Sequence, residues 1–241
     1  MKAIYKKELK SYFTSIIACL YIAITILASG IAFIICNLKT SDTVANNTEL
    51  EKVITIMSIV FLVAIPILVM RSFSEERNQK TDQLLYTTPI SIGKIIFGKF
   101  FAILTIYILP FIVMCVYPLV LKHYGDVNLK LAYANIAGLA LYGIVLIAVC
   151  MFISALTEMQ VISATISAVV LAISWCIGYF NLTSYISKEG NILTKIISCF
   201  DTYSPLRNIC SGLIDLKDIV FYVSIIILFL FLTYEAIQKR R

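Results

Sequence analysis

Charged side chains are scarce in this sequence and unevenly placed. Of its 241 residues, 14% are charged and 60% are hydrophobic, whereas a typical soluble domain is about 25% charged and about 45–50% apolar. Five long runs contain no charged residue: Ile16–Cys36, Val53–Met70, Phe100–Leu121, Leu131–Leu156 and Val161–Leu182. Each run can cross a hydrocarbon core of about 30 Å at about 1.5 Å per residue. The composition therefore excludes an ordinary soluble protein.

A sixth, shorter run completes the set of predicted spans. Ile219–Tyr234 is also uncharged, and it reaches the length of a span if its polar ends lie at the membrane interfaces. We therefore predict an all-α membrane protein with six transmembrane helices, in a single transmembrane domain over residues 1–241. The predicted bounds of the spans are 16–36, 53–70, 100–121, 131–156, 161–182 and 219–237.

Histidine is nearly absent, since His123 is the only one. It stands beside Tyr124 at the edge of a predicted loop, where an interface residue is expected. A single histidine excludes an intramembrane metalloprotease or a Ser-His protease on the number of groups that such sites need. The five longest runs also lack the ionisable side chains that proton-driven and ion-driven transporters place at membrane depth. Any transport by this chain must therefore draw its energy from another protein.

None of the seven cysteines belongs to a C-x-x-C pair. Five of them lie in or at the ends of predicted spans, where cysteine serves as a small apolar side chain. Cys199 and Cys210 share one predicted outer segment. The sequence leaves open whether these two form a disulfide, because it does not supply the required geometry.

Lysine and arginine gather on one side of the predicted bundle. If the N-terminus is cytoplasmic, the inner segments hold 12 Lys and Arg against 6 Asp and Glu, whereas the outer loops hold 8 of each. Basic residues are retained on the cytoplasmic side, so both termini are predicted to lie there. The net charge of +6 is spread over segments that flank the membrane, and it does not indicate nucleic-acid binding.

The first 15 residues predict a helix that lies in the cytoplasmic interface. Lys2, Lys6 and Lys10 recur every four residues, near anionic head groups. The adjoining apolar face would hold Met1, Tyr5, Leu9, Tyr12 and Phe13. A plain basic flank that only fixes the topology is the alternative, and the two interpretations are compatible.

The second inner segment, residues 71–99, is the only connection between predicted spans on the inner side that is long enough to hold a functional element. It reads RSFSEERNQKTDQLLYTTPISIGKIIFGK. We expect Ser74 to cap a helix whose first turn carries Glu75 and Glu76, since acids stabilise a helix N-terminus. This helix would run through Leu84 and Leu85 and end before Pro89. A second amphipathic turn, from Ser91 through Ile92, Ile95, Ile96 and Phe97, would lead into the third span.

The end of this segment, GKIIFGKF, is one residue short of a phosphate-binding loop. Gly93, Gly98 and Lys99 fit the pattern G-x-x-x-x-G-K-[ST], but Phe100 stands where the hydroxyl should be. Such a loop also needs a preceding strand and a soluble helix after it, whereas an interfacial helix is expected here. We therefore predict that Lys94 and Lys99 are charges held at head-group level, and that this stretch binds no nucleotide.

The residues from Arg71 to Lys99 resemble the segment between the second and third spans of ABC transporter type-2 permeases. The similarity is greatest to the short permeases of the gliding-motility and nitrous-oxide-accessory branches. The last residues of the chain read SPLRNICSGLIDLKDIVFYVSIIILFLFLTYEAIQKRR. They resemble the residues that lead into the last span of those permeases, and Asp215, Asp218 and Tyr222 match that pattern. One departure is Lys80 before Thr81, where the family usually has glycine.

The resemblance implies an export permease with two sets of six spans, powered by two cytoplasmic ATPase subunits. The second permease would be identical or homologous, and the complex would lie in a bacterial cytoplasmic membrane. Residues 71–99 would be a coupling segment that docks on the ATPase, with the leucines as anchors and the charges setting orientation. The docking residues would be Glu75, Glu76, Arg77, Thr81, Leu84, Leu85 and Pro89. An exposed loop with a chance charge pattern is the alternative for this segment.

No catalytic, metal-binding or cofactor-binding motif is identified in the chain, so ATP and magnesium are expected only in the partner ATPase. Residues 183–218 are predicted to form a re-entrant or interfacial outer segment, or else a plain surface loop. A membrane subunit of an ATPase-coupled assembly or signalling complex, which moves no substrate, is the alternative function. A stand-alone passive channel is a third possibility, but the elaborate inner segment of residues 71–99 argues against it. Lipid, peptide, drug and polysaccharide substrates all fit an uncharged pathway.

Overall fold

The computed structural model describes residues 2–38, 47–78, 92–124, 128–180, 200–212 and 215–239, and these parts of the chain are helical apart from short turns. Six helical stretches within them are long and apolar enough to cross a membrane. They are Ile16–Cys36, Glu51–Asn78, Ile92–His123, Leu129–Leu156, Gln160–Tyr179 and Leu216–Gln238. The prediction of an all-α protein with six spans is confirmed.

The described residues form eleven helical elements. They are α1 (Lys2–Phe13), α2 (Ile16–Phe33), a π-helix (Ile34–Leu38), α3 (Asn47–Val69), α4 (Ser74–Asn78), α6 (Ile92–Met114), α7 (Tyr117–Tyr124), α8 (Leu129–Leu156), α9 (Gln160–Tyr179), α12 (Tyr203–Cys210) and α13 (Leu216–Gln238). Two spans begin at a small polar residue that caps the helix. Ser15 Oγ accepts from the Ile17 amide at 3.2 Å, and Asn128 Oδ1 accepts from the Lys130 amide at 3.2 Å.

The long helix α8 lies at the centre of the bundle. It is the most buried of the candidate spans and packs against α3, α6, α9, α12 and α13. Its Gly143 lets α6 approach closely, because a Cβ atom there would stand 2.0 Å from Tyr107 Oη. The Tyr107 hydroxyl donates to the Leu139 carbonyl at 3.1 Å. By contrast, α9 and α13 are the least buried spans, so most of their apolar surface faces outward.

The third predicted span begins earlier and is broken. The interfacial turn at Ile92 continues without interruption into α6, as the apolar spacing predicted. Near its far end, however, the predicted span 100–121 divides into α6 and α7. Pro118 explains the break, because it has no N–H to donate to the Met114 carbonyl and its ring crowds that carbonyl.

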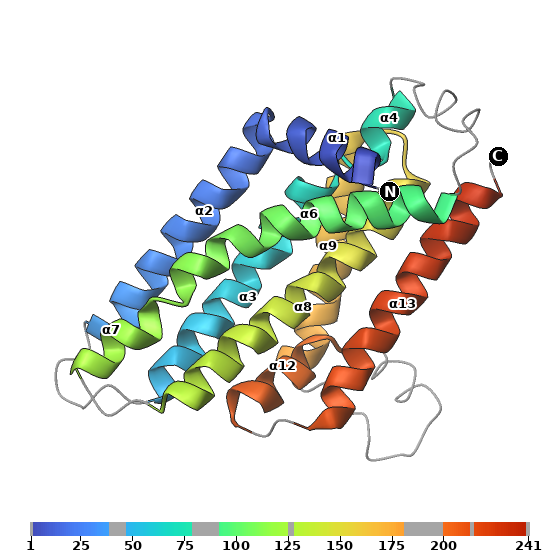
Figure 1. Cartoon of the computed structure of the whole chain (residues 1–241). Coiled ribbons are helices and arrows are strands. Elements are labelled where there is room, and N and C mark those ends of the chain that lie inside the picture. The colour runs from blue at the N-terminus through green and yellow to red at the C-terminus, as the bar shows by residue number, and fades with distance from the viewer. Residues whose placement is uncertain are drawn as a thin grey trace, which may run out of the picture.

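The two ends of the bundle differ in what they carry (Figure 1). The helices α1 and α4 lie at the end where α13 finishes, whereas α7 and α12 lie at the opposite end. Because the chain crosses the bundle an even number of times, α1 and the last residues of α13 lie at the same end. Of the predicted outer segment 183–218, α12 packs on α8 and α9. Cys199 lies outside the described residues, and a re-entrant course for the segment stays a prediction.

Candidate functional site

Lys99 of α6 is a buried charged residue with several polar partners at the α1 and α4 end. Its side chain is 2% exposed, and its Nζ donates to the Ser72 carbonyl at 2.7 Å. The same Nζ lies 2.9 Å from Glu76 Oε1 in α4 and 3.3 Å from Glu8 Oε1 in α1. We call Lys99, Glu8, Glu76 and the Ser72 carbonyl the Lys99 junction. It joins the third span, the N-terminal helix and the segment that follows the second span.

The prediction that Lys99 is a charge at head-group level is wrong. Burying an ammonium group costs several kcal/mol unless opposite charges and hydrogen bonds compensate it. Here two carboxylates and a carbonyl do so, and the Phe73 ring lies 5.1 Å from Nζ, within the range of a cation–π contact. Lys94, on the other side of the same helix, is exposed as predicted.

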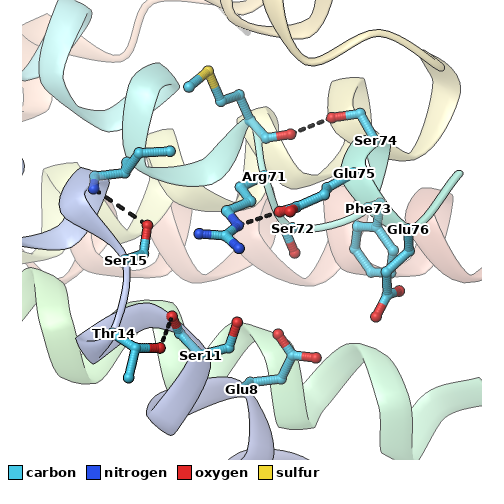
Figure 2. Close-up of polar contacts among 12 residues, drawn as sticks. Glu8, Ser11, Thr14, Ser15, Arg71, Ser72, Phe73, Ser74, Glu75 and Glu76 are labelled. Carbon is cyan, nitrogen blue, oxygen red and sulfur yellow. Dashed lines mark hydrogen bonds and ion pairs between the residues drawn. The ribbon is translucent and has the colours of Figure 1, made fainter. Parts of the chain in front are cut away.

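The two glutamates that open α4 point to different partners. Glu76 joins the Lys99 junction, whereas Glu75 pairs with Arg71 one helical turn earlier. Figure 2 shows Arg71 directed at Glu75, with Glu8 of α1 on the facing side. The next residue, Arg77, donates from Nη2 to Glu158 Oε1 at 2.7 Å and from Nη1 to the Leu156 carbonyl at 3.0 Å. It therefore ties α4 to the turn between α8 and α9.

The predicted docking residues thus fall into two groups. Glu75, Glu76 and Arg77 are all paired within the chain. Thr81, Leu84, Leu85 and Pro89 lie outside the described residues. The structure therefore brings the three charges to one place and gives each a positioning contact.

Ser154 of α8 holds the turn between α3 and α4. Its Oγ donates to the Met70 carbonyl at 3.3 Å and accepts from the amides of Phe73 and Ser74, each at 3.3 Å. Ser74 was expected to cap α4, but its own hydroxyl donates back to the Met70 carbonyl, as Figure 2 shows. A residue from another helix therefore supplies the cap, and it anchors α4 to the centre of the bundle.

A polar cavity of about 260 Å³ lies beside the Lys99 junction. It is lined by Lys7, Glu8, Ser11, Tyr12, Arg71, Ser72, Glu75, Glu76 and Lys99. Three basic and three acidic side chains balance one another, so the cavity has no excess charge to attract a free ion. Burial raises the pKa of the Tyr12 phenol, and Glu8 raises it further, so Tyr12 stays neutral at physiological pH. In the described residues, no group of three or more His, Cys, Asp and Glu side chains is placed to hold a metal.

The near phosphate loop is part of a regular helix. Gly98 and Lys99 lie beyond the first turn of α6, where backbone N–H groups are already bonded within the helix. Gly98 allows α1 to pack closely, because a Cβ atom there would stand 3.1 Å from Ile4 Cγ2. The Tyr5 hydroxyl also bonds Thr105 Oγ1 at 3.0 Å. Residues 92–99 therefore belong to α6 and pack against α1. They do not form a phosphate-binding loop.

Comparison with known proteins agrees with this architecture. The sequence profile described as ABC-2 family transporter protein matches residues 40–234. The match covers most of the chain, including α4, four of the six candidate spans in full and most of the last one. A search of curated proteins found no significant match. The chain therefore belongs to the ABC-2 family of transporter proteins, as an integral membrane permease subunit of an ABC transporter.

Proposed function

We propose that this permease forms the path of an ATP-driven exporter and is moved by a separate cytoplasmic ATPase that docks beside α4. The Lys99 junction is the observation that carries the proposal. It connects α4, at the start of the coupling segment, to the N-terminal helix and to the third span. A force applied at α4 therefore reaches the membrane helices directly.

The contacts of α4 on its other side extend this transmission to the fourth and fifth spans. Ser154 caps α4 from α8, and Arg77 reaches Glu158 in the turn that leads to α9. These bonds make it costly for α4 to move without α6 and α8. With its charges satisfied internally, α4 positions the following residues for docking, and we propose Leu84 and Leu85 as the apolar anchors on the ATPase.

The proposed complex holds two permeases, identical or homologous, and two ATPases. ATP and magnesium would be bound by the ATPases alone. Both termini would be cytoplasmic, because the inner segments hold twice as many basic as acidic residues. The family resemblance leads us to propose a bacterial cytoplasmic membrane as the location. The exposed apolar faces of α9 and α13 leave surface for lipid and for the second permease.

Affinity purification of the tagged chain from its native membranes tests the proposal. We expect an ABC ATPase with a complete phosphate-binding loop to co-purify, and we expect the variant with Leu84→Ala and Leu85→Ala to lose it. Apolar anchors at the centre of an interface commonly contribute about 2 kcal/mol or more each to binding. Full transport activity of the chain purified without any ATPase would refute the proposal.

A further inference from the structure

The polar cavity beside the Lys99 junction contains two buried hydroxyl groups that the fold leaves unused. Tyr12 of α1 and Ser72, in the turn between α3 and α4, are 3% and 2% exposed, and both line the cavity. Neither Tyr12 Oη nor Ser72 Oγ has a hydrogen-bond partner among the described residues. A bond between these two neighbouring hydroxyls would still leave one proton without an acceptor. Buried polar groups are nearly always bonded in native proteins, so the two hydroxyls indicate a bound molecule that accepts hydrogen bonds.

Basic groups with unused donors lie around these hydroxyls. Arg71 bonds Glu75 through Nε, and its two Nη groups have no partner among the described residues. In Figure 2 the Arg71 guanidinium faces the gap between α4 and α1, with Ser11 and Glu8 across it. Lys7 of α1 lines the same cavity and forms no ion pair with a described residue. A forked guanidinium, an ammonium group and several hydroxyls together suit a phosphate, whose oxygens accept many hydrogen bonds.

An acceptor for a positive group is present as well. Glu8 bonds Lys99 through Oε1 alone, so its Oε2 is left to accept another hydrogen bond. The lining holds equal numbers of basic and acidic side chains, and a cavity with both signs of charge but no net charge suits a zwitterion. A primary ammonium group can donate up to three hydrogen bonds, whereas a quaternary ammonium group has no N–H to donate.

The cavity opens where the apolar runs of the chain end. Arg71 and Ser72 directly follow the uncharged run that finishes at Met70, and α1 leads into the candidate span that begins at Ile16. Lys7, on the cavity lining, is exposed. At this boundary of a membrane the surrounding zwitterions are phospholipid head groups. The volume of about 260 Å³ far exceeds the roughly 15 Å³ that one water molecule needs, so the cavity has room for a phosphate with a short amine arm.

We propose that this cavity binds the phosphoethanolamine head group of a membrane phospholipid. The phosphate accepts hydrogen bonds from Arg71, Lys7, Tyr12 and Ser72, and the primary ammonium group donates to Glu8. A bound head group would thereby join α1 to the turn between α3 and α4. The site is built from side chains of these two segments, so it does not depend on the proposed coupling to an ATPase.

Lipid competition on the purified full-length chain tests this site. The delipidated chain in mild detergent is offered equal amounts of phosphatidylethanolamine, phosphatidylcholine and phosphatidylglycerol, and native mass spectrometry measures the bound lipids. We expect phosphatidylethanolamine to bind in at least fivefold excess over each of the others. Lys7→Gln should remove this preference. Lys6→Gln is the matched control, because it removes the same charge from an exposed neighbour that does not line the cavity, and it should keep the preference.

A second pair of variants separates lipid binding from stability. Tyr12→Phe removes a hydroxyl that bonds no described residue, so the delipidated variant should unfold at the wild-type temperature and bind phosphatidylethanolamine at least fivefold more weakly. Tyr5→Phe is its control on the same helix, because the Tyr5 hydroxyl bonds Thr105 outside the cavity. This control should bind lipid like the wild type.

Glycerophosphoethanolamine, the same head group without acyl chains, distinguishes a lipid from a soluble ligand. We expect it to displace phosphatidylethanolamine only in large excess. Tight binding of glycerophosphoethanolamine without binding of the lipid would overturn the assignment to a membrane lipid. Equal binding of the three lipids by the wild type, or an unchanged lipid preference in both Lys7→Gln and Tyr12→Phe, would overturn the site and leave water as its occupant.

Discussion

Lys99 Nζ and Glu76 Oε1 lie 2.9 Å apart and join the third span to the short helix that follows the second. The ammonium group is almost completely buried, whereas Glu76 keeps about a fifth of its side-chain surface exposed. The cation therefore depends on this carboxylate and on Glu8 more than either carboxylate depends on the cation.

Replacing Glu76 should cost more stability than an exposed carboxylate does. In Glu76→Gln, Lys99 stays buried with only Glu8 to balance its charge, and breaking a buried pair from one side costs up to about 3–5 kcal/mol. The remaining Glu8 should keep the loss to about half of that or less. Thermal unfolding in detergent measures it. Glu158→Gln is the control, since its side chain is 73% exposed and such pairs contribute about 1 kcal/mol at most.

Ser154→Ala should destabilise the chain by about 1–2 kcal/mol. The substitution removes one hydroxyl that donates to the Met70 carbonyl and accepts from the amides of Phe73 and Ser74. Buried polar groups that lose their hydrogen-bond partner destabilise the fold by about that much. Ser211→Ala is the control, because the exposed Ser211 hydroxyl donates to the Asn208 carbonyl at the end of its own helix. Equal unfolding temperatures for the two variants would refute the capping role of Ser154.

Gly143→Ala should be among the most damaging small substitutions. The added methyl group would lie 2.0 Å from Tyr107 Oη and 2.4 Å from Cζ, so α6 and α8 would have to separate. Overpacking of this kind costs about 1–3 kcal/mol. Expression level and unfolding temperature report it. For Gly93→Ala, where nothing lies within 4 Å, we expect no loss, and alanine adds up to about 1 kcal/mol of helix propensity.

Reporter fusions should place both termini in the cytoplasm. The charge distribution and the even number of spans lead to this expectation. Fusions after Arg241 should be active with a cytoplasmic reporter, and fusions within residues 40–47 with an external one. An external C-terminus would contradict the six-span topology.

The spans and the course of α6 were predictable because composition and periodicity are local properties. The break before Pro118 was not readable from proline alone, since Pro66 and Pro110 lie inside the unbroken helices α3 and α6. The sequence indicates the burial of Lys99 only weakly. It stands three and four residues after Ile96 and Ile95, on the face that packs inward, but a lysine at the start of a span usually extends to the interface.

The partners of Lys99 and of α4 were not predictable from the sequence. Glu8, Ser154 and Glu158 are ordinary residues in their own segments. Only tertiary packing brings Glu8 to Lys99 and brings Ser154 and Glu158 to α4. Gly98 was noticed for its place in a near phosphate loop, whereas its role is to admit Ile4. Contacts between distant segments depend on tertiary packing, which local patterns do not specify.

ATP hydrolysis by the purified permease–ATPase complex in lipid bilayers, compared between wild type and Lys99→Met, tests the account most directly. Lys99→Met keeps a side chain of similar length but removes the charge that ties α4 to α1 and α6. Lys99→Arg, which keeps the charge, is the control, and all samples are measured below the unfolding temperature of the variants. We expect the ATPase to stay attached in Lys99→Met while permease-dependent stimulation of hydrolysis falls at least fivefold. Full stimulation by a folded Lys99→Met permease would contradict it.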